Sequence, residues 1–217
     1  MTVQKSKNLS QNQIRRLVIT GMLAAIVVIL VLTPLGMLQI GPIATTFAHI
    51  PVLIGLLAEG PVVGLVLALF FGAFSMFRAF QAPTLLSVFF QDPLVSILPR
   101  LMIPLVAWGA YLLLKKVLPE SKSKMRIAWA GAGVVGSLTN TALVLSSLYF
   151  LHAQGMIEKF AQEVSANTSS ALAQYLSAPG KFLFFAVALP NGLPEAVVTL
   201  ILIPAIMAAV MAIKKRR

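Results

Sequence analysis

Long stretches without any charged side chain constrain this chain more than any other feature of its sequence. No Lys, Arg, Asp or Glu occurs in residues 17–58, 127–157 or 196–213. A membrane-spanning helix needs roughly 20 mostly apolar residues, so each stretch is long enough for at least one span. Only 11% of the residues are charged, whereas a soluble domain carries about 25%. The sequence therefore predicts an integral membrane protein.

The composition also excludes several classes of protein. The net charge of +11 is of the sign that nucleic acids attract, but the basic residues flank the apolar stretches instead of forming one face of a soluble domain. Cysteine is absent, which excludes disulfides and thiolate metal sites. We therefore expect a membrane bundle that binds no nucleic acid.

The hydropathy pattern predicts an all-α fold of six transmembrane helices in a single domain, residues 1–217. The first apolar run lacks a small-residue cleavage site after it, so it is interpreted as a retained helix and not as a signal peptide. Proline interrupts the fourth and sixth helices, and the connection at 33–46 is rich in Gly, Pro and Thr. The expected helices are Leu17–Leu32, His49–Ala58, Pro61–Ala79, Pro93–Leu114, Ile127–Leu151 and Gly180–Ile213.

The positions of the basic residues predict the orientation of the six helices. Thirteen of the 17 lysines and arginines lie in segments 1–16, 115–126 and 214–217, and six helices place all three segments on one side. The positive-inside rule assigns that side to the cytoplasm, with both termini inside. Segment 154–178 is then a polar extracellular loop. Part of it is a candidate amphipathic helix, because apolar residues recur there at helical spacing.

Signatures of enzymes are missing from the chain. It contains no G-x-x-x-x-G-K-[ST], no G-x-S-x-G and no H-E-x-x-H, so we expect no ATP hydrolysis, no catalytic residue and no metal site in this chain itself. The two histidines, His49 and His152, have no nearby cluster of carboxylates in the sequence. A membrane protease or metalloenzyme therefore has little support.

Polar residues inside apolar helices are the strongest candidates for function, because such groups are costly in lipid and usually face the protein interior. Arg100 lies in the fourth expected helix, Asn140 in the fifth, and Asn191 and Glu195 in the sixth, beside prolines that break the helices. This combination favours a binding cavity for a small molecule. The alternative is structural: Arg100 and Glu195 form an ion pair, and the asparagines join helices by hydrogen bonds.

The first helix carries small residues four positions apart. Gly21 and Ala25 form one such pair, and Thr20 and Ala24 form another. This spacing allows a second helix to approach closely. The partner could be another protein, or a helix of the same bundle.

Several short motifs together resemble the substrate-binding S components of energy-coupling factor (ECF) vitamin transporters, most closely the members assigned to pantothenate. The resemblance covers nearly the whole chain and is strongest over 33–104. The motifs are T-P-L-G at 33–36, I-G-P-I-A-T-T at 40–46, H-I-P-V at 49–52, D-P-L at 92–94, L-P-R at 98–100 and N-G-L-P-E at 191–195.

The resemblance implies a subunit of the bacterial plasma membrane that captures a vitamin from outside. It would dock on a transmembrane coupling protein and two ATPase subunits, so that ATP is used by those partners and this chain needs no cofactor. Members of the family use an Ala-x-x-x-Ala motif on the first helix for docking. Gly21 and Ala25 occupy the matching positions here, with Thr20 and Ala24 beside them.

Pantothenate is an anion with hydroxyl groups and an amide, so its site needs a cation and hydrogen-bonding side chains. Arg100 is expected to hold the carboxylate, because a guanidinium can bind it through two hydrogen bonds. Arg78 is the competing cation, although it lies near a helix end where it can snorkel to the headgroups. Glu195 could pair with Arg100 in the empty state. The remaining expected binding residues are Asn140, Asn191, Thr45, Thr46 and His49.

Two other readings of the sequence stay open. One is an S component for a different vitamin or small solute. The other is a membrane scaffold subunit that transports nothing and whose polar residues serve only packing.

Overall fold

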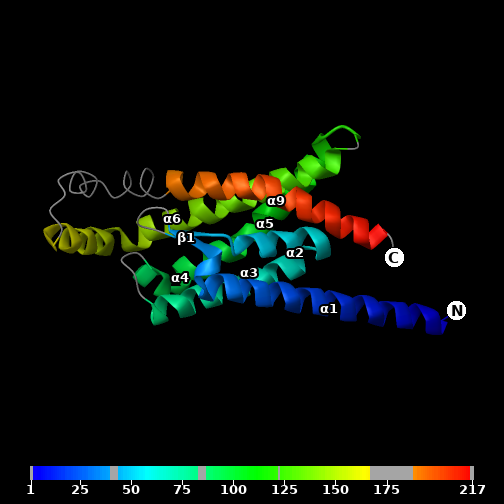
Figure 1. Ribbon diagram of the computed structural model, residues 1–217, viewed down its shortest axis with the longest axis horizontal. Coiled ribbons are helices and arrows are strands. Elements are labelled where there is room, and N and C mark those ends of the chain that lie inside the picture. Colours follow the sequence, from blue (N-terminus) through cyan, green and yellow to red (C-terminus); the bar gives the residue numbers. More distant parts are fainter. Residues whose placement is uncertain (1, 40–43, 83–86, 122, 167–187, 216–217) are drawn as a thin grey trace.

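The structure is a computed structural model that describes residues 2–39, 44–82, 87–121, 123–166 and 188–215. Its elements form an elongated helical bundle with one small hairpin (Figure 1). In chain order they are α1 (Thr2–Leu32), η1 (Pro34–Gly36), β1 (Met37–Gln39), β2 (Ala44–Thr46), α2 (His49–Glu59), α3 (Pro61–Gln81), η2 (Ser87–Gln91), α4 (Pro93–Ser96), α5 (Leu98–Val117), α6 (Lys124–Ala166) and α9 (Leu189–Lys215).

Five helical segments are long and apolar enough to cross a membrane, and α2 is a shorter apolar helix. Together they account for the six predicted helices, so the predicted all-α membrane class is confirmed. Both termini lie at the same end of the bundle (Figure 1), as an even number of spans requires. The long segments are Gln11–Leu32, Pro61–Gln81, Pro93–Val117, Lys124–His152 and Asn191–Ile213.

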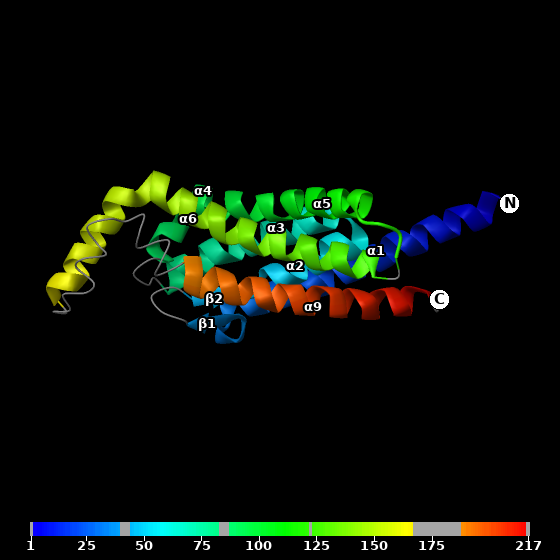
Figure 2. The ribbon, with the colours of Figure 1, turned by 90° about the horizontal axis from the view of Figure 1, so that it is seen from above.

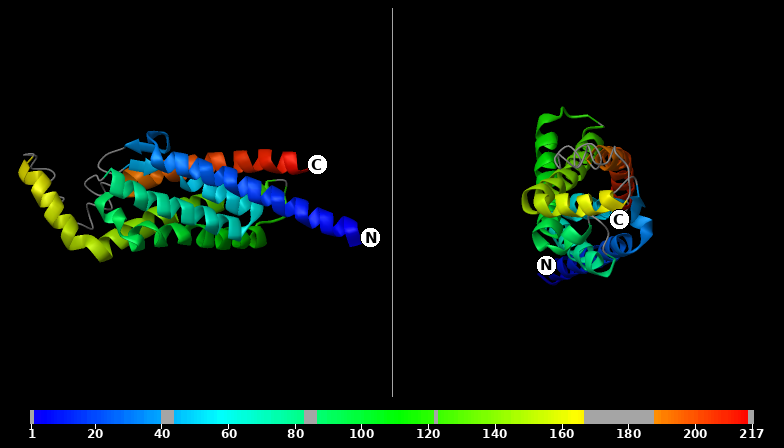
Figure 3. Two further views of the ribbon diagram at one scale, coloured as in Figure 1. Left: turned by 90° about the horizontal axis from the view of Figure 1, so that it is seen from below. Right: turned by 90° about the vertical axis from the view of Figure 1, so that its left-hand side faces the viewer.

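The short helix α2 lies at the centre of the bundle. It packs against α1, α3, α5, α6 and α9, and Figure 3 shows the bundle of these helices from below and end-on. Its inward residues Leu53 and Leu56 are fully buried, together with Leu67 of α3 and Ile203 of α9. A helix surrounded by protein on all sides needs little contact with lipid, which explains why α2 can be short.

Helix α1 is longer than the sequence predicted. Residues 1–16 were expected to form a polar segment before a helix that starts at Leu17, but the helix begins at Thr2. Residues 2–16 contain no Gly or Pro. Extending an existing helix costs far less than starting one, so a polar sequence without helix breakers continues it.

The fourth predicted helix is divided into two. Asp92 accepts a hydrogen bond from the backbone N–H of Leu94 through Oδ1 (2.9 Å) and so caps α4, which Pro93 starts. Ile97 separates α4 from α5, but its φ of −99° and ψ of −48° stay in the helical region, so the two helices form one continuous span. Pro99 lies in the first turn of α5 and Pro104 in its interior.

Helix α6 bends at His152, whose φ of −130° and ψ of 17° are not helical. The membrane-spanning part ends there, close to the predicted end at Leu151, and the segment up to Ala166 turns away from the bundle (Figure 2). The first half of the predicted outer loop is therefore helical. The rest of that loop, and the predicted helix start at Gly180, lie outside the described residues.

The connection between α1 and α2 contains a β-hairpin. The sequence predicted only a shaped connection there, without strands. Strands β1 and β2 pair antiparallel, with Met37 opposite Thr46 and Leu38 opposite Thr45. The backbone N–H of Phe47 closes the connection by donating to the carbonyl of Gly36 (3.0 Å).

The turn between α2 and α3 lies at Gly60. Its φ is 98°, a conformation that glycine adopts without strain.

Candidate functional site

Arg100 is buried, with 4% of its surface exposed. It lies in the half of the bundle away from the two chain termini (Figure 1), which is called the outer half below according to the predicted orientation. Its Nη1 donates to the backbone carbonyl of Val95 (2.6 Å). In an unbroken helix that carbonyl would accept from the N–H four residues later, at position 99, but Pro99 has no N–H. The L-P-R motif thus places a free carbonyl beside the arginine that uses it.

Aromatic rings surround the guanidinium of Arg100. Its Cζ lies 5.4 Å from the centre of the Phe71 ring and 4.9 Å from that of Phe90, within range of cation–π contact. None of the ion pairs within 4.0 Å in the described part of the chain involves Arg100. The direct Arg100–Glu195 pair that the sequence suggested does not form, although the two charges attract each other across the interior.

Glu195 uses its carboxylate to join three elements. It is 3% exposed, and its Oε1 accepts from the backbone N–H of Thr46 (3.0 Å) at the end of β2. Its Oε2 lies 3.5 Å from the hydroxyl of Thr141 on α6. Because these donors occupy the carboxylate, Glu195 fixes the first connection to α9 and α6, and the sequence alone could not distinguish this role from pairing with Arg100.

Thr46 and His49 are linked through the backbone. The Nδ1 of His49 lies 2.9 Å from the carbonyl of Thr46. A carbonyl can only accept, so Nδ1 carries the proton and Nε2 of a neutral ring is left as an acceptor. That Nε2 is buried and has no hydrogen-bond partner. Thr46 and His49 thus lie beside Glu195 in the bundle interior, and their role in substrate binding stays a prediction. Thr45 lies in β2, and its side chain is outside the described part.

Asn140 on α6 is also buried, and its Oδ1 has no hydrogen-bond partner. Ser137, one turn along the same helix, is fully buried with an unpartnered hydroxyl. The sequence reasoning missed Ser137, although its three-residue spacing from Asn140 places both side chains on one helix face. Asn191 and Thr199 add two more buried polar side chains from α9.

Packing contacts place His49 at the level of Asn140. A Cβ added to Gly136 of α6 would lie 2.6 Å from Cδ2 of Leu53 on α2, so these two residues touch. The two helices run in opposite directions (Figure 1). One turn outward from this contact therefore leads to His49 on α2 and to Asn140 on α6.

Arg78 does not join this group. Its Nη1 donates to the carbonyls of Val31 and Thr33, which lie at the C-terminal end of α1, where helical carbonyls lack donors. The guanidinium thus contacts the end of α1, and the expectation that Arg78 snorkels to the headgroups stays a prediction. Its role here is to hold the ends of α1 and α3 together.

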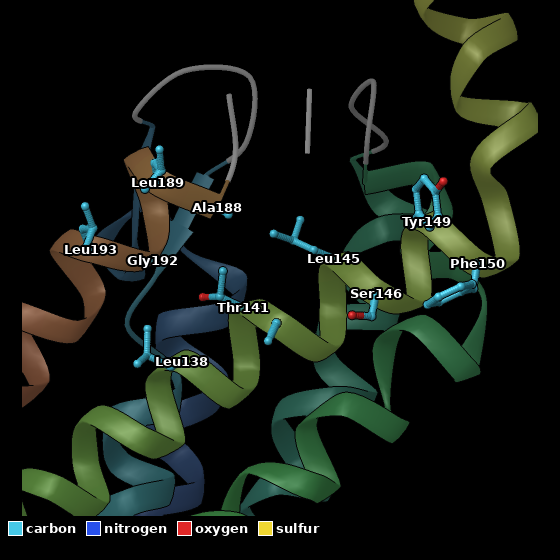
Figure 4. Close-up of a pocket in the computed structure, with 11 residues that line it drawn as sticks. Leu138, Thr141, Leu145, Ser146, Tyr149, Phe150, Ala188, Leu189, Gly192 and Leu193 are labelled. Carbon is cyan, nitrogen blue, oxygen red and sulfur yellow. The ribbon is translucent and has the colours of Figure 1, made fainter. Parts of the chain in front are cut away.

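An apolar groove lies between α6 and α9, beside the polar residues. Figure 4 shows it between the outer half of α6 and the start of α9. Its volume is about 490 Å³, and its polar groups include the hydroxyls of Thr141, Ser146 and Tyr149. Thr141 belongs both to this groove and to the contact with Glu195, so the groove adjoins the buried polar group.

The two small-residue pairs of α1 point in different directions. Gly21 and Ala25 are exposed, and a Cβ at Gly21 would meet nothing within 4 Å. Ala24 is buried against the bundle, and the hydroxyl of Thr20 donates to the carbonyl of Arg16 (2.7 Å). Only the Gly21–Ala25 face is thus available to a partner helix, and docking there stays a prediction.

Within the described part of the chain, no three metal-ligating side chains come together. A comparison with curated proteins found no match. The family model described as "ECF transporter, substrate-specific component" matches residues 15–207, which covers every polar residue named above. A bundle of apolar helices with a polar interior and no enzyme signature is what such a component requires. The chain belongs to the family of ECF transporter substrate-specific components.

Proposed function

We propose that this S component captures a small organic anion from outside the cell, with pantothenate as the first candidate. The observation that carries the proposal is Arg100, a guanidinium that is 4% exposed and has no acidic side chain within 4.0 Å in the described residues. A buried charge without a counter-charge is costly in a membrane protein. The carboxylate of a bound substrate would remove that cost.

The groups that already contact Arg100 do not neutralise it. Val95 supplies a carbonyl dipole, and the rings of Phe71 and Phe90 supply their faces. These contacts hold the guanidinium in place while its charge remains. The Nε of Arg100 is also buried without a hydrogen-bond partner. A planar carboxylate matches such a fork of donors.

The deeper part of the site favours a ligand that also carries hydrogen-bond donors. His49 Nε2 and Asn140 Oδ1 are buried acceptors without a donor, and such groups are rare in folded proteins. Counted from the Ala107–Gly136 contact, Arg100 lies about 10 Å outward and Asn140 about 6 Å outward. The hydroxyl and amide N–H groups of pantothenate could therefore reach these acceptors while its carboxylate binds Arg100.

Uptake requires partners that supply energy. We propose that a transmembrane coupling protein and two ATPases fill this role, because the chain has no nucleotide-binding motif. The exposed face at Gly21 and Ala25 is the proposed docking surface, since it leaves room for a closely packed helix. The proposed setting is the bacterial plasma membrane.

Calorimetric titration of the purified chain tests the substrate. Arg100→Gln should reduce pantothenate affinity by at least about 30-fold, because removing one partner of a buried charge pair costs 2–5 kcal/mol. Arg78→Gln is the matched control and should bind like wild type. Pantothenol, which lacks the carboxylate, should bind wild type and Arg100→Gln equally. Normal pantothenate binding by Arg100→Gln would exclude the proposed contact.

The orientation is tested separately, because the chain has no cysteine of its own. A single cysteine at Ser121 or in the 214–217 tail should be protected from an impermeant maleimide in intact cells, and one at Ser165 should react. Labelling of the Ser121 position from outside would reverse the proposed orientation.

A further inference from the structure

The segment η2–α4, residues 87–96, supplies two of the contacts that hold Arg100. Val95 of α4 gives the carbonyl that accepts from Nη1, and Phe90 of η2 gives the nearer of the two rings. The position of this segment therefore decides where the guanidinium points. Two contacts tie the segment to α3: Gln91 Nε2 donates to the carbonyl of Ala79 (3.1 Å), and Ser96 Oγ donates to that of Gly72 (3.3 Å).

The same segment is tied to α6 by one ion pair. His152 Nε2 lies 3.1 Å from Oδ2 of Asp92. A carboxylate accepts, so the imidazole nitrogen is the donor. The other oxygen of Asp92 caps α4 through the N–H of Leu94. One carboxylate thus sets the start of α4 and binds it to the neighbouring helix.

Packing of rings reinforces the pair. The ring of Phe89 lies 5.2 Å from that of His152, and Gly155, three residues further along α6, lies beside the same ring. His152 is also the residue at which α6 bends. The bend therefore directs its imidazole toward Asp92 and Phe89.

We propose that the Asp92–His152 pair is a positioning device for Arg100. It holds α4 against α6, and α4 in turn holds the guanidinium at the angle at which it meets an anion. The proposal rests on the function proposed above, since it concerns the same arginine. Neither Asp92 nor His152 touches Arg100 in any described contact, so both act only through Val95 and Phe90.

The pair is partly open to solvent, with exposed side-chain fractions of 28% for His152 and 30% for Asp92. A pair of this kind contributes little to the stability of a fold. Its loss should therefore leave the bundle intact and change alignment instead. We expect His152→Ala to lower pantothenate affinity by roughly threefold to fivefold.

Two variants distinguish a loss of Arg100 alignment from a general disturbance of the bundle. His152→Gln keeps a donor at the end of its side chain and should restore most of the affinity. Leu151→Ala, next to it on an exposed face, should bind like wild type. Pantothenol should bind wild type and His152→Ala equally, because it has no carboxylate for Arg100 to hold. A loss of affinity that is equal for both ligands would overturn the positioning role.

A measurement without any ligand tests the mechanical part. Spin labels on cysteines at Leu94 of α4 and Leu113 of α5, both exposed, should lie about 30 Å apart. Pulsed electron spin resonance should show a broader distance distribution in His152→Ala and a narrow one in His152→Gln. An unchanged distribution in His152→Ala would overturn the proposal. If wild type binds no pantothenate, the proposed substrate fails, and the spin labels still decide whether the pair holds α4.

Discussion

The outer and inner halves of this bundle are built on different principles. The outer half contains Arg100, His49, Asn140 and Glu195, all buried and several with unpartnered atoms. The inner half also has two buried nitrogens without a partner, on Arg15 and Trp129, but its centre is closed by side chains that pack into glycines. A Cβ at Gly64 would lie 2.9 Å from Cβ of Leu56. One half thus gathers most of the buried polar side chains, while the centre of the other is closely packed around Gly64.

This difference suggests that the two halves of the bundle have different structural roles. Close packing resists any change in volume, so the inner half serves as a rigid base. The outer half is held by a few hydrogen bonds, and the backbone of α6 leaves helical geometry there at His152. We expect substitutions in the two halves to fail in different ways.

The largest effect on stability is expected in the inner half. Gly64→Ala would bring a methyl group to 2.9 Å from Leu56 and 3.1 Å from Pro104. Such overpacking costs about 1–3 kcal/mol, and thermal unfolding in detergent should show it. Gly109→Ala is the matched control, because nothing lies within 4 Å of its Cβ; it should be neutral or stabilising. Equal melting temperatures for the two variants would contradict the rigid base.

The next effect belongs to the outer half. Glu195→Ala removes the acceptor of the Thr46 N–H, and an unpaired buried donor costs about 1–3 kcal/mol. The hairpin should then open, so amide hydrogen exchange in residues 44–47 should become faster and substrate affinity should fall. Glu195→Gln keeps a carbonyl oxygen and should retain slow exchange. Slow exchange in Glu195→Ala would show that the hairpin is held by other contacts.

A smaller effect is expected at the inner end of α1. Arg15 Nη2 contacts both carboxylate oxygens of Glu59, at 3.1 and 3.3 Å; the side chain of Arg15 is 35% exposed and that of Glu59 is 8% exposed. Solvent reaches the arginine side of the pair, and glutamine keeps the shape and an oxygen acceptor of Glu59, so Glu59→Gln should cost less than about 1 kcal/mol and leave substrate binding unchanged. Melting curves at low and high salt measure it. A loss above that value would mean that the pair belongs to the packed base.

The smallest effect on the isolated chain is expected at the exposed face of α1. Gly21→Leu meets open space, so stability and substrate affinity should equal those of wild type. Assembly with the coupling protein should fail, since a bulky side chain prevents close helix packing. Ala24→Leu, on the buried face, should do the reverse and lower stability first. Normal assembly of Gly21→Leu would remove this face from the docking surface.

The sequence predicted the spans well because hydropathy is a local property. The turn at Gly60–Pro61 and the bundle class followed from it directly. The burial of Arg100 was also predictable, since an arginine inside an apolar helix has few alternatives. What could not be predicted were contacts between distant segments.

Glu195 shows why those contacts were missed. Its partner is the backbone N–H of Thr46, 149 positions away. Every residue except proline has such an N–H, so the sequence does not show which one binds the carboxylate. The same holds for Arg78, whose acceptors are the carbonyls of Val31 and Thr33. The pairing of His152 with Asp92 depends on where α6 bends, and no helix breaker in the sequence marks that residue.

Main-chain atoms hold two of the charged groups in this interior. Val95 offers its carbonyl to Arg100, and Thr46 offers its amide to Glu195. A substitution at Val95 keeps the carbonyl, and any substitution at Thr46 except proline keeps the N–H, so neither contact requires a particular side chain. Under the function that we propose, a side chain that faces the substrate could then change while the backbone atoms that hold Arg100 and Glu195 stay in place.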